Sequence, residues 1–380
     1  MNLFDVYPLI PVTLVKADGC RLWDEQGLEY LDLYGGHAVI SIGHSHPHYV
    51  ERISEQVKQL GFYSNSIQIP LQQALADKLA KLSCLHSYQL FLVNSGAEAN
   101  ENALKMASFV TKKPGFIAFS GSFHGRTSAA VALTDNPKLV APCNAREDFH
   151  ILPFGDLESV EQVLSTKAIA GIIVEGIQGV GGIQVPNPDF LIGLSALAKK
   201  YGAKLILDEV QSGYGRTGRF FAHQWVDGLY PDLITIAKGM GNGFPIGGLL
   251  LSEEFKASFG LLGTTFGGNH LACAAGLAVL EVIEAERLQQ KALELGERLM
   301  AELRTIPGVM AVRGKGLMIG LDLNQDAGPI RSLLVSKYKM FTGSAAGKET
   351  IRLLPPLTIE WNQLNSFVVA LKELLSSETH

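Results

Sequence analysis

The sequence predicts an α/β fold built on a mostly parallel central sheet. Short apolar runs alternate with longer helical patterns through the middle of the chain. The runs at 204–210 and 246–252 show no polar alternation over most of their length, as expected for strands covered on both faces. With 380 residues, 47% of them hydrophobic, the chain can bury the cores of two or three domains.

The elements of the central region follow one another in a regular order. Strands are expected at 88–93, 115–120, 168–175, 204–210, 232–237 and 246–252. Helical patterns follow the first strand (ANENALKMASFV) and, after a glycine-rich stretch, the third (DFLIGLSALAKKYG). Strands that alternate with helices indicate an α/β layer.

The two ends of the chain differ from the middle. Residues 10–34 predict a small meander, with turns at Asp18-Gly19 and Gln26-Gly27. A helical pattern from about 271 to 304 precedes strand-like 311–323, a helix, a short strand at 350–353 and a last helix at 360–376. We therefore expect an N-terminal segment, 1–45, packed on a small α+β domain, 266–380, with a large domain, 46–265, between them.

Charge and hydropathy exclude several classes. The net charge is −5, from 32 basic and 37 acidic residues, which argues against nucleic acid as a partner. No window of 18 apolar residues predicts a membrane span, and the first residues lack the pattern of a signal peptide. Charged residues make up only 18%, below the usual ~25%, which favours surface buried against a second subunit.

The four cysteines, at positions 20, 84, 143 and 273, are scattered and form no CxxC motif. They indicate neither a disulfide framework nor a zinc site. The expected compartment is the cytoplasm.

Ligands of open α/β sheets bind beyond the carboxyl ends of the strands. After 88–93 come Asn94-Ser95-Gly96-Ala97 and a helix. Small residues at a helix N-terminus let backbone N–H groups hold a phosphate. The alternative is an ordinary cap, with Ser95 or Asn94 satisfying the first turn.

The segment after 115–120 carries Phe123 and Arg126. An aromatic ring can stack on a planar ligand, and an arginine can hold a carboxylate. The alternative is a packing phenylalanine and a surface arginine.

Asp208 and Glu209 end the run 204–210 in a pattern that resembles the second nucleotide motif of P-loop ATPases. That interpretation needs a GxxxxGK[ST] partner. The nearest match, GSAAGKET at 343–350, has the wrong glycine spacing and a glutamate after its lysine. Asp208 therefore serves another purpose at the edge of the sheet.

Lys238 follows the apolar run 232–237. A lysine that is partly desolvated near other cations loses basicity and becomes a nucleophile towards aldehydes. The alternative is a lysine whose stem is buried at a strand end and whose ammonium reaches water.

Together these features match the needs of pyridoxal 5'-phosphate. Its aldehyde forms a Schiff base with a lysine, and its pyridinium nitrogen needs an acidic partner. Its phosphate needs N–H donors, and its ring needs a flat contact.

The motifs NSGAEANENALKMA, FHGRT, LILDEVQSGYGRTG, Lys238-Gly239 and GTTFGGNHLACAA resemble those of the class III (ω-amino) aminotransferases. Within that family they are most similar to the acetylornithine/succinylornithine aminotransferase group. The resemblance covers nearly the whole chain and implies fold type I, pyridoxal phosphate as cofactor, and a homodimer with shared active sites.

The resemblance also implies roles for individual residues. Lys238 is the Schiff-base lysine and proton shuttle, and Asp208 pairs with the pyridinium nitrogen. The other cofactor-binding residues that it implies are Ser95, Gly96 and Ala97 (phosphate), Phe123 and Val210 (ring faces), Gln211 (ring hydroxyl), Glu209 beside Asp208, and Thr265 (the neighbouring subunit's phosphate). The implied substrate-binding residues are Arg126, Arg352, Thr264, Glu175 and His37.

The implied reaction moves the δ-amino group of an N-acylornithine, acetyl or succinyl, to 2-oxoglutarate and gives the semialdehyde and glutamate, as in arginine biosynthesis. Two arginines suit a dicarboxylate, since each guanidinium can hold one end. Other donors of the same family, ornithine, 4-aminobutyrate or a lysine-derived amine, remain open. A catalytically inactive protein of this fold, acting as a binding or regulatory module, is disfavoured by the presence of Lys238, Asp208 and Phe123.

The sequence departs from the family in two places, Val180 and His270, and carries His37 in the segment that lines the family's substrate entrance. EGIQGVGG at 175–182 keeps Glu175 but has Val180 where the family has a second glutamate, so Arg352 should stay available. His270 replaces a usual proline, and His37 stands where an imidazole can contact an acyl group or serve a structural role.

The histidines of GHSHPH, at 44, 46 and 48, have a spacing that invites a metal site. Pro47 breaks any helical face there, and the family has a related GHxHP. We expect no metal.

Overall fold

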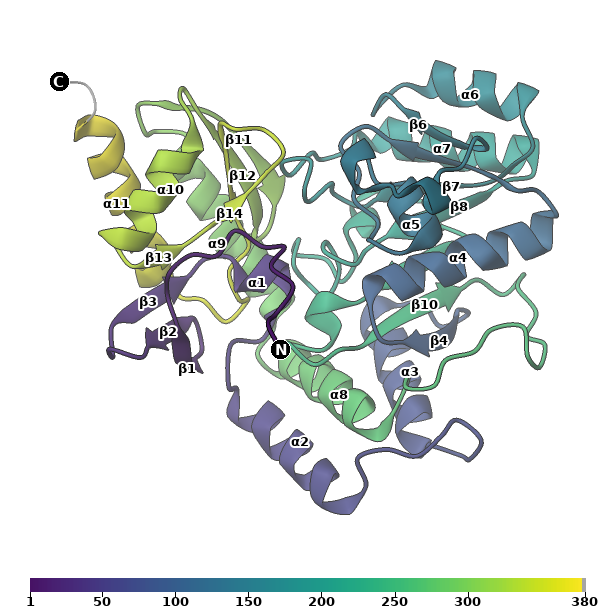
Figure 1. Cartoon of the computed structure of the whole chain (residues 1–380), viewed down its shortest axis with the longest axis horizontal. Helices are drawn as coiled ribbons and strands as arrows, with labels where there is room; N and C mark the ends of the chain where they lie inside the picture. Colours follow the sequence, from purple (N-terminus) through teal and green to yellow (C-terminus); the bar gives the residue numbers. More distant parts are fainter. Residues whose placement is uncertain (378–380) are drawn as a thin grey trace.

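The computed structural model describes residues 1–377 and forms two lobes (Figure 1). The larger lobe holds a seven-stranded sheet, in which only β10 runs antiparallel to its neighbours. Its strands, in spatial order, are β4 (Gln89–Val93), β10 (Gly247–Leu251), β9 (Leu233–Ile236), β8 (Lys204–Asp208), β7 (Ile169–Glu175), β5 (Gly115–Phe119) and β6 (Phe149–Leu152). The predicted α/β fold with a mostly parallel central sheet is confirmed.

Helices cover both faces of this sheet, which explains the unbroken apolar runs. Ile117 and Phe119 of β5 face one core, together with α6 (Leu157–Thr166) and α7 (Pro188–Tyr201). Phe116 and Ala118 of the same strand face the other core, together with α4 (Gly96–Thr111). Successive side chains of a strand point to opposite faces, so a strand between two cores has no polar side.

The helix ends follow local capping rules. Ser95 caps α4, because its side chain accepts a hydrogen bond from the Glu98 N–H at 3.2 Å, and Lys112 ends that helix with φ 58°. Asn187 caps α7, Pro188 opens it, and Gly202 ends it with φ 61°. These stops hold each helix to the length that spans the sheet.

The smaller lobe joins the two ends of the chain. The antiparallel strands β1 (Leu14–Asp18), β2 (Arg21–Asp24) and β3 (Glu29–Asp32) extend to β13 (Met340–Phe341), which pairs parallel with β3. A second sheet has the order β11 (Val309–Lys315), β12 (Met318–Leu323), β15 (Thr350–Leu353) and β14 (Gly343–Ser344). The N-terminal meander thus packs on the C-terminal part, while the domain boundaries remain a prediction.

The remaining helices lie around these sheets (Figure 1). They are α1 (Gly35–Ala38), α2 (Pro47–Gln59), α3 (Pro70–Ser83), α5 (Ser128–Ala132), α8 (His270–Ala285), α9 (Leu288–Leu303), α10 (Ala327–Ser336) and α11 (Trp361–Ser377). None of the helices in residues 1–377 has the length and apolar character needed to cross a membrane.

The structure differs from the predicted elements in several places. The strand-like run 311–323 is an antiparallel pair, β11 and β12. The expected helix at 271–304 is two helices, because Arg287 adopts a left-handed φ of 52° between α8 and α9. The strand β6 was not predicted, since its four residues, FHIL, are too short to show a periodic pattern.

Candidate active site

A cavity of about 380 Å³ lies at the carboxyl ends of the parallel strands. Its walls come from the segments that follow β4, β5, β7, β8 and β9. The structure brings together here the predicted residues Ser95, Gly96, Ala97, Phe123, Arg126, Glu175, Asp208, Val210, Gln211 and Lys238.

Lys238 lies directly after β9, in a short 3-10 turn (Lys238–Met240), with a left-handed φ of 48°. This backbone conformation is costly for any residue other than glycine and is often found at functional sites. Among residues 1–377 its Nζ has no hydrogen-bond or ion-pair partner. Burial lowers the pKa of Lys238, helped by Arg352 and opposed by Asp208 and Glu175. The cavity therefore presents a free amine of reduced basicity.

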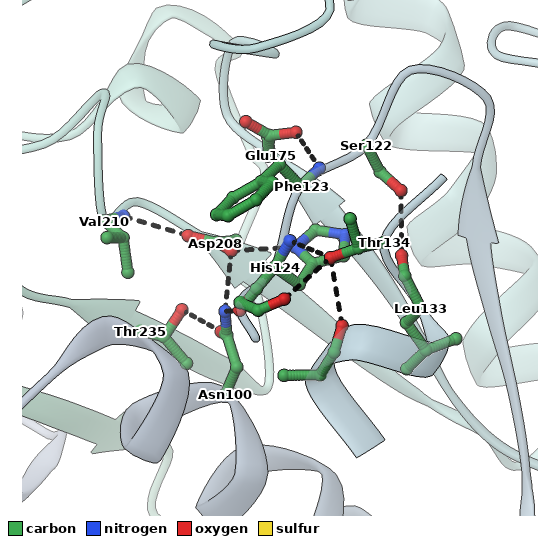
Figure 2. A network of polar contacts seen from close by, with 12 residues as sticks. Asn100, Ser122, Phe123, His124, Leu133, Thr134, Glu175, Asp208, Val210 and Thr235 are labelled. Carbon is green, nitrogen blue, oxygen red and sulfur yellow. Dashed lines mark hydrogen bonds and ion pairs between the residues drawn. The ribbon is translucent and has the colours of Figure 1, made fainter. Parts of the chain in front are cut away.

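Asp208, the last residue of β8, receives three hydrogen bonds (Figure 2). Its Oδ2 accepts from Asn100 Nδ2 and from His124 Nδ1, each at 2.8 Å, and its Oδ1 accepts from the Val210 N–H at 3.0 Å. These three donors hold in place a carboxyl group that is only 4% exposed. Asp208 is thus a fixed carboxylate at the rim of the cavity.

The side-chain amide of Asn100 is oriented to donate a hydrogen bond to Asp208. Thr235 Oγ1 donates to Asn100 Oδ1 at 2.7 Å, so the amide Nδ2 must point the other way, towards Asp208 and the His124 carbonyl. Asn100, His124 and Thr235 are not among the predicted site residues. A polar residue inside an apolar strand, as Thr235 is in DLITIA, is the signal that would have indicated a buried network.

Glu175 ends β7 and is the register partner of Asp208. Its Oε1 accepts from the Phe123 N–H at 3.0 Å and its Oε2 from the Gly179 N–H at 2.8 Å. Burial raises its pKa to about 7, with Asp208 adding to the increase and His124 opposing it. This carboxyl therefore titrates near neutral pH.

The N-terminus of α4 faces the same cavity. Ser95 acts as the helix cap, but the first-turn N–H groups of Gly96 and Ala97 have no intrahelical acceptor. A Cβ at Gly96 would lie 2.7 Å from Val210 Cγ1, so this position requires glycine. The segment can serve both as a helix cap and as a phosphate site, because capping by Ser95 leaves the N–H groups of Gly96 and Ala97 to bind an anion.

Arg352 of β15 reaches towards this cavity from the smaller lobe. It is only 3% exposed, and its Nη2 donates to Tyr34 OH at 3.0 Å. A longer contact, 3.4 Å, joins its Nη1 to Gln211 Oε1. No carboxylate of residues 1–377 forms an ion pair with Arg352. Its hydrogen-bond acceptors in the described part of the chain are neutral.

Tyr34 also contacts His37, at 2.5 Å between the hydroxyl and Nδ1. Since the hydroxyl accepts from Arg352, its own proton is directed to Nδ1, which places the imidazole proton on Nε2. Burial lowers the pKa of His37, with Arg352 and Lys238 adding to the effect. His37 is thus a neutral imidazole beside two cations.

A left-handed turn carries His37. All four residues of α1, from Gly35 to Ala38, have positive φ angles, and His37 has the largest, 67°. Asp32 holds the turn, because its Oδ1 accepts from the Tyr34 and Gly35 N–H groups at 2.9 and 2.7 Å. Asp32 and Tyr34 are not among the predicted site residues.

Five predicted site residues do not line the cavity: Arg352 and His37, described above, and Glu209, Thr264 and Thr265. Glu209 does not face it, contrary to expectation, because Ser212, Ala222 and His223 donate to its carboxylate. Thr264 lines a neighbouring cavity, and Thr265 is exposed on the same loop.

The histidines of GHSHPH are paired with carboxylates: His44 with Asp32, His46 with Glu286 and His48 with Glu281. Over residues 1–377 no group of three potential ligands is placed to hold a metal ion. His270 opens α8, and nothing in the structure explains the replacement of proline there.

The residues present fit pyridoxal phosphate. The cavity offers a free amine at Lys238, a fixed carboxylate at Asp208 and two free helix N–H groups at Gly96 and Ala97. Figure 2 places the ring of Phe123 above Asp208, where a flat ligand can lie against it. An aldehyde, a ring nitrogen, a phosphate and a ring face are the four groups that these residues can serve.

Comparison with known proteins gives one consistent family. The family profile "Aminotransferase class-III" matches residues 5–375. The chain is 39% identical to an acetylornithine aminotransferase of Oceanobacillus iheyensis, over 98% of this chain and 95% of that protein. It is 38% identical to one of Bacillus subtilis, over 99% and 98%.

Solved structures agree with this result. An ornithine aminotransferase from Toxoplasma gondii matches with a TM-score of 0.90 at 27% identity, covering 98% of this chain and 93% of that one. An (S)-enantioselective ω-transaminase from Thermomicrobium roseum matches with a TM-score of 0.88 at 28% identity, covering 99% and 97%.

Proposed function

Because the chain belongs to the class-III aminotransferases and is a pyridoxal-phosphate-dependent enzyme, we propose that it transfers the δ-amino group of an N-acylornithine to 2-oxoglutarate. The products are the semialdehyde and glutamate, as in arginine biosynthesis. The relatives named acetylornithine aminotransferase, at 38–39% identity over nearly the whole chain, support the donor. The observation that carries the chemistry is the unpaired Nζ of Lys238 in a cavity that also holds the Asp208 carboxylate.

The residues of the cavity divide the work of holding the cofactor. Bound pyridoxal phosphate supplies an aldehyde that reacts with amines and a ring that takes up the electrons released at the donor carbon. Lys238 would bind the aldehyde and, as a free amine, would carry the proton between the donor carbon and the cofactor. Asp208 holds the ring nitrogen in its protonated form, because a fixed carboxylate raises the pKa of a group that it contacts.

The other contacts fix the cofactor in place. Phe123 and Val210 flank the ring, and Gln211 reaches its hydroxyl. The first-turn N–H groups of Gly96 and Ala97, with Ser95, hold the phosphate at the positive end of α4.

Two arginines set the choice of substrate. Arg126 and Arg352 hold the two carboxylates of 2-oxoglutarate, and Arg352 is free for this in both halves of the reaction because neutral acceptors hold it. His37 contacts the acyl group of the donor through its Nε2–H. Thr264 and Glu175 complete the substrate side.

A second copy of the chain completes the site. Phe62, Tyr63, Phe259 and Phe266 are 43–110% exposed, and the rings of Phe62 and Phe266 lie 5.4 Å apart. Exposed aromatic side chains of this kind favour a protein interface. Phe266 follows Thr265 on one loop, so a homodimer formed here brings Thr265 to the phosphate of the partner.

Other donors fit the same machinery. The ornithine aminotransferase among the similar structures favours ornithine as the second candidate. The related donors 4-aminobutyrate and a lysine-derived amine use the same lysine and carboxylate. For the compartment we propose the cytoplasm, supported by four cysteines that are all free thiols.

One half-reaction tests the donor. The purified enzyme in its cofactor-bound form is mixed in turn with N-acetylornithine, N-succinylornithine, ornithine and 4-aminobutyrate, and the absorbance of the lysine-bound cofactor is followed. Rapid loss with one acylornithine supports the proposal and identifies the acyl group. Loss only with a free ω-amine rejects the acylornithine donor and leaves the transamination chemistry standing.

A further inference from the structure

A second cavity, separate from the cofactor cavity, lies in the smaller lobe. It measures about 660 Å³ and opens between the N-terminal segment 8–12 and helix α10. Its walls include Tyr30, Arg331, Ser332, Val335, Lys339 and Ser344. None of the residues assigned to the cofactor or the substrates lines it.

The charged side chains that line this cavity are all basic. Arg331 and Lys339 are its ionisable basic residues, and no aspartate or glutamate lines it. The nearby Asp24 is engaged by the Tyr30 hydroxyl and by the N–H groups of Gln26 and Leu28. The cavity is therefore a positively charged space without a carboxylate of its own.

Arg331 in particular lacks a counter-ion. Its Nη2 donates to the Thr342 carbonyl at 2.9 Å, whereas its Nε is buried with no acceptor. No ion pair involves Arg331 in residues 1–377. A partly buried guanidinium with a single neutral partner is unfavourable unless an anion completes its surroundings.

The rest of the lining is apolar or carries hydroxyl groups. Val335 contributes aliphatic surface from α10, and Leu9 and Ile10 of the N-terminal segment are 82% and 49% exposed beside it. Ser332 and Ser344 contribute hydroxyl groups. Ser332 is next to Arg331 in the sequence, and Ser344 lines the same cavity. A ligand with an anionic end and an aliphatic body matches this combination.

We propose that this cavity binds a small organic carboxylate, whose carboxylate group pairs with Arg331 and whose aliphatic part lies against Val335. Lys339 adds a second positive charge, although its Nζ also donates to the Ser336 carbonyl at 2.7 Å. The two Nη groups of the guanidinium carry N–H donors in one plane, which is a geometry that holds a carboxylate through two hydrogen bonds.

The cavity is close to the substrate arginine but distinct from it. Ser344 lines the cavity, and its backbone carbonyl accepts a hydrogen bond from Arg352 Nε. Tyr34, which accepts from Arg352, also lies in the field of Arg331. A binding experiment must therefore separate the two arginines.

The test measures binding rather than turnover. Arg126→Gln and Arg352→Gln are combined in the cofactor-bound enzyme to remove the substrate arginines, and glutarate is titrated into this background by calorimetry. We expect one glutarate per chain with a Kd of about 1 mM or below. Adding Arg331→Gln should weaken binding at least about 10-fold, the loss of a bidentate charged contact.

Two further variants show whether a loss of binding comes from the lost charge or from misfolding. Arg331→Lys keeps the charge and should retain measurable binding, and Arg304→Gln, at an exposed arginine of the same lobe, should leave binding unchanged. Absence of glutarate binding in the background, or binding that survives Arg331→Gln, would overturn the proposal. Inorganic phosphate that binds as tightly as glutarate would overturn the assignment to a carboxylate with an aliphatic body.

Discussion

Glu175 and Asp208 are register partners at the ends of β7 and β8, so two buried carboxyl groups lie side by side at the rim of the cavity. Their hydrogen-bond partners differ. Asp208 accepts from Asn100, His124 and the Val210 N–H, whereas Glu175 accepts from two backbone N–H groups only. Burial, with the nearby Asp208 carboxyl, raises the pKa of Glu175 to about 7.

The proton on Glu175 makes stability depend on pH. A glutamate titrates near 4.3 in an unfolded chain, but burial raises the pKa of Glu175 to about 7. The folded, cofactor-free protein should therefore lose about 3 kcal/mol as pH rises from about 4.5 to 7. Glu175→Gln should remove this loss, measured as melting temperature against pH. Glu158→Gln, at an exposed glutamate, serves as control, and equal profiles for all three proteins would contradict the assignment.

Lys238→Ala should abolish transamination, because no other amine is available in the cavity to react with the cofactor. We expect a fall in kcat of at least about 10³-fold and no absorbance band from lysine-bound cofactor. Lys112→Ala, at an exposed lysine, should leave both unchanged. A Lys238→Ala enzyme that kept full activity would refute the covalent role.

Asn100→Ala should disturb the cofactor through Asp208. The carboxylate loses one of its donors, and a hydrogen bond to a charged group contributes about 1.5–3 kcal/mol, so kcat should fall about 10- to 100-fold. The pH titration of the cofactor absorbance should shift as well, which a loss of stability alone does not produce. Asn102→Ala, on the same helix with its amide bonded to the Glu98 carbonyl, is the matched control. An unshifted titration would rule out the positioning role.

Gly96→Ala should weaken cofactor binding. The new Cβ would lie 2.7 Å from Val210 Cγ1, and overpacking of this kind costs about 1–3 kcal/mol. Equilibrium dialysis of the cofactor should show a dissociation constant about 10-fold higher or more. Val210→Ala removes the clash but also a contact of the cofactor ring, so it serves as a second background: Gly96→Ala should cost much less affinity there than in the native chain. An equal cost in both backgrounds would mean that the contact is not the cause.

Tyr34→Phe should raise the KM for 2-oxoglutarate about 10-fold with little change in kcat. Arg352 would lose its shortest side-chain partner and adopt more conformations, so its placement for the substrate carboxylate would suffer. Steady-state kinetics measures the effect. Tyr201→Phe, which removes a hydroxyl bonded to Glu161 on the other lobe, should change neither constant. A change in kcat alone would argue for a different role of Tyr34.

The sequence predicted the large sheet because strands such as β7 and β8 are apolar on both faces and end in carboxylates. It also located Lys238, Asp208 and Phe123, since each lies directly after a strand or carries a family motif. It did not locate Asn100 or Thr235, whose roles depend on contacts across 135 residues that no local pattern reveals. Glu209 lies in the same motif as Asp208, but nothing in the sequence indicated that its side chain points away from the cofactor cavity.

The Tyr34–His37 pair escaped sequence analysis for a further reason. The turn that carries it is left-handed, and His37 is an unusual residue for such a turn. The turn exists because Asp32 binds two of its N–H groups, a local contact. Its relation to Arg352, however, crosses 318 residues and required the structure.

The pairing of β3 with β13 has a consequence for how the enzyme is made. Leu31 lies opposite Met340, so the ribosome must synthesise nearly the entire chain before the first sheet can close. The seven strands of the larger lobe are complete by Leu251 and can assemble while translation continues. The turn with Tyr34 and His37 follows β3, and its contact with Arg352 of β15 also requires the C-terminal part of the chain. A nascent chain released before β13 would carry the cofactor residues but lack a finished substrate entrance.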